Sequence, residues 1–222
     1  MDRIKDPASP YPQMLPSAAQ FAAYMTELGI RRDDILVVYD TLAVGLYSSP
    51  RVAWTCRHFG HEHVHVLNTF RQYVAAGFPL QTAFSLQDPS PIEYLVQSVQ
   101  SDQVITCEEL ETIIQQNQNV QILDSRPETR FIQGHMPRAR NIPLPSLLDP
   151  DQSFLSPTQL RQLFERSGVD KTLPLVVTCN SGVTAAALAL ALRLAGYPNP
   201  IRLYDGSWSE WMHRGTIEIH SI

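Results

Sequence analysis

The chain has 222 residues, a formal net charge of −5 and a pI near 5.8. This length allows one large or two small domains with an ample apolar core, and the acidic balance gives no basic footprint for nucleic acid. No apolar run reaches the ~18–20 residues that a membrane span needs, so we expect neither a nucleic-acid nor a membrane partner. Cys56, Cys107 and Cys179 are far apart and form no CxxC pair. This spacing disfavours a disulfide framework and a zinc site and suits a reducing compartment.

The first half of the chain alternates helical and strand patterns. Helices are predicted over residues 17–30 and 50–60, and strands over 35–40 and 63–68. From about residue 84 to 102 the periodicity dissolves into polar and Pro-containing sequence. We therefore predict an N-terminal domain over 1–83, a linker over 84–102 and a second domain over 103–222.

The second half repeats this order. Helices are predicted over 106–116, 156–168 and 182–197, and strands over 120–126, 173–179 and 201–205. Alternating strands and helices are typical of an α/β fold in which helices cover both faces of a parallel sheet. When the halves are aligned, Asp40 stands after the first-half strand where Cys179 stands after the second-half strand, and each half ends in a predicted aromatic helix, within "TFRQYVAAG" and "SWSEWMHRG".

The stretch "VVTCNSGVTAAALAL" is the main functional signal. A loop between a parallel strand and a helix lies at the carboxyl edge of the sheet, where open α/β folds bind ligands. Its backbone N–H groups and the positive end of the helix dipole can stabilise a thiolate at Cys179. Gly182 permits the turn, while Ser181 and Thr184 add hydroxyl donors. The alternative is a buried structural cysteine with ordinary helix capping.

A phosphate-binding cysteine is excluded by the absence of a cation. Such a site needs an arginine at the end of the loop to hold the phosphate dianion. Here the loop from Asn180 to Thr184 is followed by Ala185 and two further alanines.

The motifs "CNSGVTA", "RLYDGSWSEW", "DSR" and "RFIQGHMPRARNIP", together with "SPYPQMLP" and "GLYSSPRVAW", give the chain a resemblance to the tandem rhodanese family. The resemblance implies two rhodanese-like domains and a cysteine, Cys179, that carries sulfane sulfur as a persulfide. A persulfide anion also needs the N–H groups described above, which the residues Asn180, Gly182, Val183 and Ala185 would complete. No cofactor is implied, because the protein itself carries the sulfur.

The loop sequence bears on the sulfur donor. Thiosulfate enzymes of the family resemble Cys-Arg-Lys-Gly-Val-Thr and 3-mercaptopyruvate enzymes resemble Cys-Gly-Ser-Gly-Val-Thr, and this chain is closer to the second. The resemblance places the substrate arginine at Arg130 and gives Asp124 and Arg126 a structural role. A second family arginine lies in an insertion that this sequence lacks, and we consider Arg138 and Arg140 as substitutes.

The first half departs from the family pattern. The family has a strand and a helix ahead of "SPYPQML" that are missing here, so we expect the first domain to be incomplete. Asp2 falls where the family has an acidic residue facing the active site, and Gln13 replaces a histidine of the mercaptopyruvate enzymes. Both are considered minor contributors to the site.

The alternating histidines His61, His63 and His65 could form a metal site, but the interleaved valines favour a half-buried strand with the histidines outward. We expect no metal.

Together these observations predict a sulfurtransferase that moves sulfur from 3-mercaptopyruvate, through Cys179, to an acceptor. The acceptor would be cyanide, a small thiol, thioredoxin or a sulfur-carrier protein. The alternatives are a thiosulfate sulfurtransferase and a non-catalytic rhodanese-like binding module. The resemblance implies a cytoplasmic or mitochondrial protein.

Overall fold

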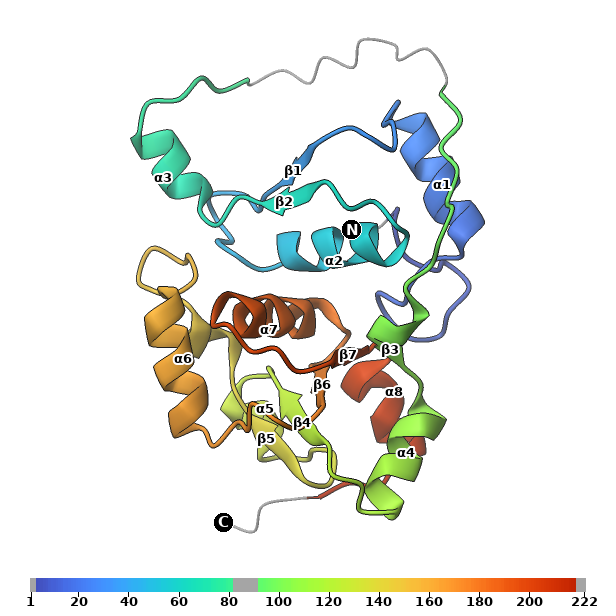
Figure 1. Ribbon diagram of the computed structural model, residues 1–222, viewed down its shortest axis with the longest axis vertical. Helices are drawn as coiled ribbons and strands as arrows, with labels where there is room; N and C mark the ends of the chain where they lie inside the picture. Colours follow the sequence, from blue (N-terminus) through green and yellow to red (C-terminus); the bar gives the residue numbers. More distant parts are fainter. Residues whose placement is uncertain (1–2, 82–91, 219–222) are drawn as a thin grey trace.

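The computed structural model describes residues 3–81 and 92–218, which form two unequal α/β halves (Figure 1). The first half contains α1 (Ala18–Glu27), β1 (Leu36–Val38), α2 (Ser49–His58), β2 (Val64–Val66) and α3 (Phe70–Ala75). Its two strands are parallel, with Val37 opposite His65. The strand–helix–strand order agrees with the prediction for this half.

The second half holds a five-stranded sheet in the order β3-β7-β6-β4-β5, and all of its neighbouring strands are parallel. Its strands are β3 (Val104–Ile105), β4 (Gln121–Asp124), β5 (Ala139–Asn141), β6 (Leu175–Thr178) and β7 (Ile201–Tyr204). Its helices are α4 (Cys107–Gln115), α5 (Glu128–Phe131), α6 (Pro157–Arg166), α7 (Val183–Leu194) and α8 (Ser207–Arg214), with short 3-10 turns at Ser101–Gln103 (η1) and Leu144–Leu147 (η2). The predicted parallel α/β class is confirmed.

Local sequence explains where the helices begin. Ser17, Thr106 and Ser156 each form a capping box with a Gln or Glu three residues later, which satisfies two otherwise unpaired groups at the helix start. All four residues of β6 are buried, as expected for a central parallel strand covered on both faces. The chain therefore leaves the core where β6 ends.

The two halves meet where α2 packs against α7 (Figure 1). Leu46 belongs to the apolar core of the second half, and Trp54 and Val66 pack against it. Tyr94, from the segment predicted to be a linker, is buried in the first core, and its N–H donates to Thr26 Oγ1 at 2.9 Å. The described end of that segment thus lies along the first half.

Among the α-helices and strands of the described residues, three short ones have no counterpart in the prediction: β3, α5 and β5. Each has four residues or fewer, too few to show a periodic pattern. Within the described residues, no helix combines the length and the apolar character required to cross a membrane.

Candidate active site

Cys179 directly follows β6 and is 2 % exposed. Gly182 ends the loop in a left-handed conformation, with φ 75°, and α7 begins at Val183. A Cβ added at Gly182 would lie 2.8 Å from Nη1 of Arg51 and 3.1 Å from the carbonyl oxygen of Asp205. Glycine is therefore required for two reasons, the backbone conformation and the lack of space.

Residues at the start of α8 hold the cysteine loop in place by hydrogen bonds. The Oγ of Ser207 accepts from the N–H of Cys179 at 3.3 Å and of Gly182 at 3.0 Å, and donates to the carbonyl of Tyr204 at 2.8 Å. The N–H of Trp208 donates to the carbonyl of Cys179 at 2.9 Å. Hydrogen bonds therefore fix both ends of the loop to the start of α8, directly after the neighbouring strand β7.

Five N–H groups of the loop and the first turn of α7 have no protein acceptor within the described residues: those of Asn180, Ser181, Val183, Thr184 and Ala185. They belong to the loop and to the N-terminus of α7, where the helix dipole adds positive potential. A small anion bound here would gain these donors without any side-chain cation. The N–H of Gly182, expected among these donors, is instead bonded to Ser207.

The loop's side chains differ in their environments. Val183 and Ala185 bury their side chains, so only their backbone can face a ligand. The Thr184 Oγ1 lies 2.7 Å from the Oγ of Ser125, which in turn lies 3.4 Å from the carbonyl of Thr178. When Ser125 donates to that carbonyl, Thr184 donates to Ser125. Ser181 is half-buried.

A cleft of about 690 Å³ opens beside the loop. It is lined by Arg126, Pro127, Arg130, Gln133, Gly134, Asn180, Trp208 and Met212. Arg130 and Asn180, predicted from separate motifs, therefore share one cavity. The exposed Arg130 side chain makes no hydrogen bond or ion pair with the described part of the protein, so its guanidinium is available to a ligand.

Arg126 is held by its neighbours on three sides. Its Nε donates to Asp124 Oδ2 at 2.8 Å, its Nη2 donates to the carbonyl of Gly134 at 3.0 Å, and its guanidinium lies 4.2 Å from the Trp208 ring centroid. Asp124 is fully buried, and burial raises the pKa of its carboxyl against the opposing effect of Arg126. The ion pair with Asp124 therefore holds Arg126 in place at the edge of the cleft.

Arg138 and Arg140 do not line the cleft. Arg138 donates to the carbonyl of Gln118 at 2.8 Å, and Arg140 to that of Ser167 at 2.9 Å. These carbonyls precede β4 and β6, so both arginines lie toward the side of the sheet where these strands begin, opposite Cys179. In this position Arg138 and Arg140 do not replace the missing substrate arginine, contrary to the possibility considered from the sequence.

The first half contributes side chains that the sequence analysis did not select. Burial raises the pKa of Tyr47, and the charge of a Cys179 thiolate raises it further, so the two groups are coupled electrostatically. Arg51 donates to Asp205 Oδ1 at 2.6 Å and to the carbonyl of Gln13 at 2.8 Å. Gln13 is thus linked to the back of the loop through Arg51, whereas Asp2 lies outside the described residues.

Known proteins resemble the chain over nearly its full length. A rhodanese-like domain model matches residues 106–214. The thiosulfate sulfurtransferase of Bos taurus is 38 % identical over 98 % of this chain and 76 % of its own length, and the human 3-mercaptopyruvate sulfurtransferase is 37 % identical over the same shares. The chain belongs to the tandem rhodanese family of sulfurtransferases.

Solved structures of this family agree with the fold. The Tum1 protein of Saccharomyces cerevisiae superimposes with a TM-score of 0.86 at 34 % identity, covering 96 % of this chain and 77 % of that one. SseA from Escherichia coli, described as a 3-mercaptopyruvate sulfotransferase, superimposes with a TM-score of 0.81 at 33 % identity, covering 94 % of this chain and 79 % of that one. The expected rhodanese-like architecture is confirmed.

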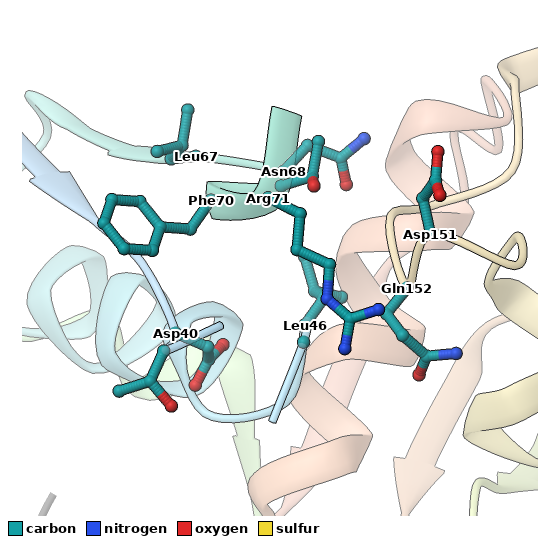
Figure 2. A pocket seen from close by; sticks show the side chains of 11 residues that line it. Asp40, Leu46, Leu67, Asn68, Phe70, Arg71, Asp151 and Gln152 are labelled. Carbon is teal, nitrogen blue, oxygen red and sulfur yellow. The ribbon is translucent and has the colours of Figure 1, made fainter. Parts of the chain in front are cut away.

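A second pocket lies at Asp40, the residue that aligns with Cys179 when the two halves are compared (Figure 2). The Asp40 carboxylate accepts from the backbone N–H groups of Tyr47, Ser48 and Ser49, each at 2.9 Å. A carboxylate thus already occupies the anion-binding position that corresponds to the cysteine loop. The pocket beside it has about 10 Å³ of free volume, which suits a water molecule rather than a donor.

The remaining thiols differ from Cys179 in their setting. Cys56 lies within α2, where burial raises its pKa to about 12, and burial also raises the pKa of Cys107 at the start of α4. Cys56 follows no strand. Cys107 comes two residues after β3, but its side chain is 1 % exposed and packs in the apolar core with Ile105 and Trp211, so it does not face a ligand site.

The three histidines do not share one outward face. His61 is fully buried, with Nδ1 3.1 Å from the Tyr94 hydroxyl and Nε2 3.0 Å from the carbonyl of Asp34, while His63 and His65 are exposed. His61 precedes β2, so the strand alternation does not reach it, and the outward orientation predicted for it is wrong. No group of three or more metal-binding side chains occurs among the described residues.

Proposed function

We propose that this protein transfers sulfane sulfur from 3-mercaptopyruvate, through a persulfide on Cys179, to a thiol, cyanide or sulfur-carrier acceptor. The observation that carries the proposal is the set of five N–H groups, unpaired among the described residues, that follow a cysteine at the carboxyl edge of the sheet. Such a nest of N–H groups stabilises a sulfur anion without a cofactor.

The first half-reaction places a negative charge on sulfur and on the leaving group. The Cys179 thiolate attacks the sulfur of the donor, an S–S bond forms and the C–S bond breaks. The electron pair of that bond leaves with the pyruvate enolate, which takes a proton from water. The persulfide loses its own proton to solvent and remains as an anion at the N-terminus of α7.

The second half-reaction restores the enzyme. An acceptor thiolate or cyanide attacks the outer sulfur, the S–S bond breaks, and the electron pair returns to Cys179 as thiolate. An exposed cleft beside the loop is compatible with both small acceptors and a carrier protein's flexible end.

The choice of donor rests on charge. The exposed guanidinium of Arg130 lines the cleft together with Asn180 and would pair with the single carboxylate of mercaptopyruvate. Thiosulfate is a compact dianion, and the loop from Asn180 to Thr184 contains no cation to match its second charge. The relatives include both thiosulfate and 3-mercaptopyruvate sulfurtransferases at 37–38 % identity, so identity alone favours neither donor.

The description of one relative bears on the compartment. One structural neighbour, at 32 % identity and a TM-score of 0.84, is described as a sulfur transferase subunit of yeast mitochondrial complex I. We propose the mitochondrion or the cytoplasm as the compartment of this chain.

The decisive experiment is intact-mass analysis of the reduced protein after incubation with 3-mercaptopyruvate. The proposal predicts a gain of one sulfur, about 32 Da, on Cys179, and its loss when cyanide is added. Cys179→Ser should gain nothing. A wild-type chain that is folded but never gains this mass would instead favour the binding-module alternative.

A further inference from the structure

A guanidinium from the first half lies directly behind the cysteine loop of the second. Arg51, on α2, is 2 % exposed. Its Nη2 donates to Asp205 and to the carbonyl of Gln13, and its planar group lies 4.7 Å from the Trp54 ring centroid. One side of the guanidinium is therefore fully engaged with structural partners.

The other side has no partner. Nη1 of Arg51 is buried and makes no hydrogen bond among the described residues. It also lies 2.8 Å from the place where a Cβ of Gly182 would be, so it faces the backbone of the cysteine loop. Buried polar groups in proteins are almost always hydrogen-bonded, and leaving one unpaired is costly. An acceptor that arrives with the reaction would remove this cost.

Arg51 is also the cation that the loop lacks. Arg126 and Arg130 line the cleft beside the loop together with Asn180, and the other titratable groups near the loop are Tyr47, Asp205 and His58. Burial raises the pKa of Tyr47 and lowers that of His58, so both are neutral near pH 7.5. The ion pair of Arg51 and Asp205 has no net charge. It is polar, however, and its positive end, the free Nη1 of Arg51, faces Gly182.

We propose that Arg51 is the cation of the sulfur-binding site and that its Nη1 donates to the sulfur anion carried by Cys179, first as thiolate and then as persulfide. The persulfide part rests on the proposed function, whereas the thiolate part does not. The first half then has an electrostatic role in the chemistry of the second half, beyond covering α7.

The test compares two alkylating reagents of similar size on the reduced protein. Iodoacetate is an anion and iodoacetamide is neutral, so the ratio of their rates at Cys179 reports positive charge beside the thiol. Peptide mapping restricts the measurement to Cys179. We expect Arg51→Gln to lower this ratio about fivefold or more, and Arg51→Lys to keep most of it. Arg202→Gln is the matched control, because Arg202 pairs with Glu109 elsewhere in the second half.

A second variant separates charge from structure. Arg51→Gln leaves the Asp205 carboxylate buried without its partner, so Arg51→Gln/Asp205→Asn removes both charges and is measured beside it. The proposal predicts a low ratio in the double variant as well. A wild-type ratio there would mean that Arg51 only neutralises Asp205, and would overturn the proposal. Alkylation requires no sulfur transfer, so a protein that never forms a persulfide would overturn the proposed function and leave this test readable.

Discussion

Ser207 and Gly182 are 25 residues apart in sequence, and the N–H of Gly182 donates to the Oγ of Ser207 at 3.0 Å. The same oxygen accepts from Cys179, so one hydroxyl closes the loop between the thiol and the first turn of α7. Ser207 adopts φ 51°, an uncommon conformation for a residue with a side chain. Its backbone is held in place to bring this hydroxyl behind the loop.

Replacing Ser207 by Ala should destabilise the protein by about 1–3 kcal/mol, because two buried N–H groups lose their acceptor. The rate of persulfide formation should fall as well, since the loop is no longer closed. Chemical unfolding and rapid-quench mass analysis measure the two effects. Ser146→Ala, which removes a hydroxyl bonded to Pro143 away from the site, should leave sulfur transfer unchanged. A Ser207→Ala protein as stable and as fast as wild type would contradict this role.

Arg130→Ala should raise KM for 3-mercaptopyruvate by about tenfold, equivalent to about 1.4 kcal/mol, with little change in kcat. The reason is that Arg130 is proposed to bind the non-reacting carboxylate of the donor. Steady-state kinetics with a saturating acceptor would measure both constants. Arg138→Ala removes an exposed arginine outside the cleft and should leave KM unaltered. An equal rise in KM for both variants would argue against a specific Arg130 contact.

Cys56→Ser and Cys107→Ser should retain persulfide formation, while Cys179→Ser should abolish it. Burial raises the pKa of Cys56 to about 12 and also raises that of Cys107, so neither thiol ionises near neutral pH. Only the thiolate attacks sulfur. Intact-mass analysis of the three variants after incubation with donor gives the answer, and retained sulfur on Cys179→Ser would refute the site.

The sequence was sufficient to predict the second half's architecture because its strands and helices have strong periodic patterns. An apolar strand before Cys179 and a glycine just before an alanine-rich helix define the loop without any tertiary information. Arg130 and Asn180 share the cleft because their segments follow β4 and β6, which are adjacent in the sheet. Parallel neighbours bring their carboxyl ends together, so this convergence follows from topology.

The residues that were missed depend on contacts between distant segments. Arg51 and Asp205 are 154 positions apart, and nothing in either local sequence indicates that they pair. Ser207 follows β7, a neighbour of β6, and the run "DGSW" after that strand was the available signal. Strand alternation predicts that His61 is exposed, but β2 begins only at Val64, so the alternation does not apply to His61.

Acidification should weaken the first half through His58. Burial lowers the pKa of His58 below its ordinary value of 6.5, so the folded protein resists a proton that the unfolded chain accepts. Stability is therefore full above pH 6.5 and is lost as pH falls from 6.5 toward the folded-state pKa. Chemical unfolding at pH 7.5 and 5.5 should show a decrease, and His58→Phe, which keeps a ring against Trp54, should show a smaller one. An exposed control, His63→Gln, should match wild type, and an undiminished decrease in His58→Phe would contradict the assignment.

Donor preference is the sharpest test of the loop's chemistry. Near the thiol the loop offers N–H and O–H dipoles, and Arg51 behind it adds the one free end of a guanidinium whose other end is paired with Asp205. These groups can stabilise the single charge of a thiolate, a persulfide or a leaving enolate. The second charge of thiosulfate stays unmatched, and such a contact in a desolvated site costs about 1–3 kcal/mol.

We therefore predict that kcat/KM favours 3-mercaptopyruvate over thiosulfate by about one to two orders of magnitude. Changing Asn180 to Arg and Ser181 to Lys together should narrow or reverse this preference, because two fixed charges would then meet the dianion. Asn180→Gln/Ser181→Thr keeps the loop polar but uncharged and should preserve the wild-type preference. Parallel steady-state assays with both donors and cyanide as acceptor give the two ratios. A wild-type protein that prefers thiosulfate would show that charge in this loop does not determine the donor.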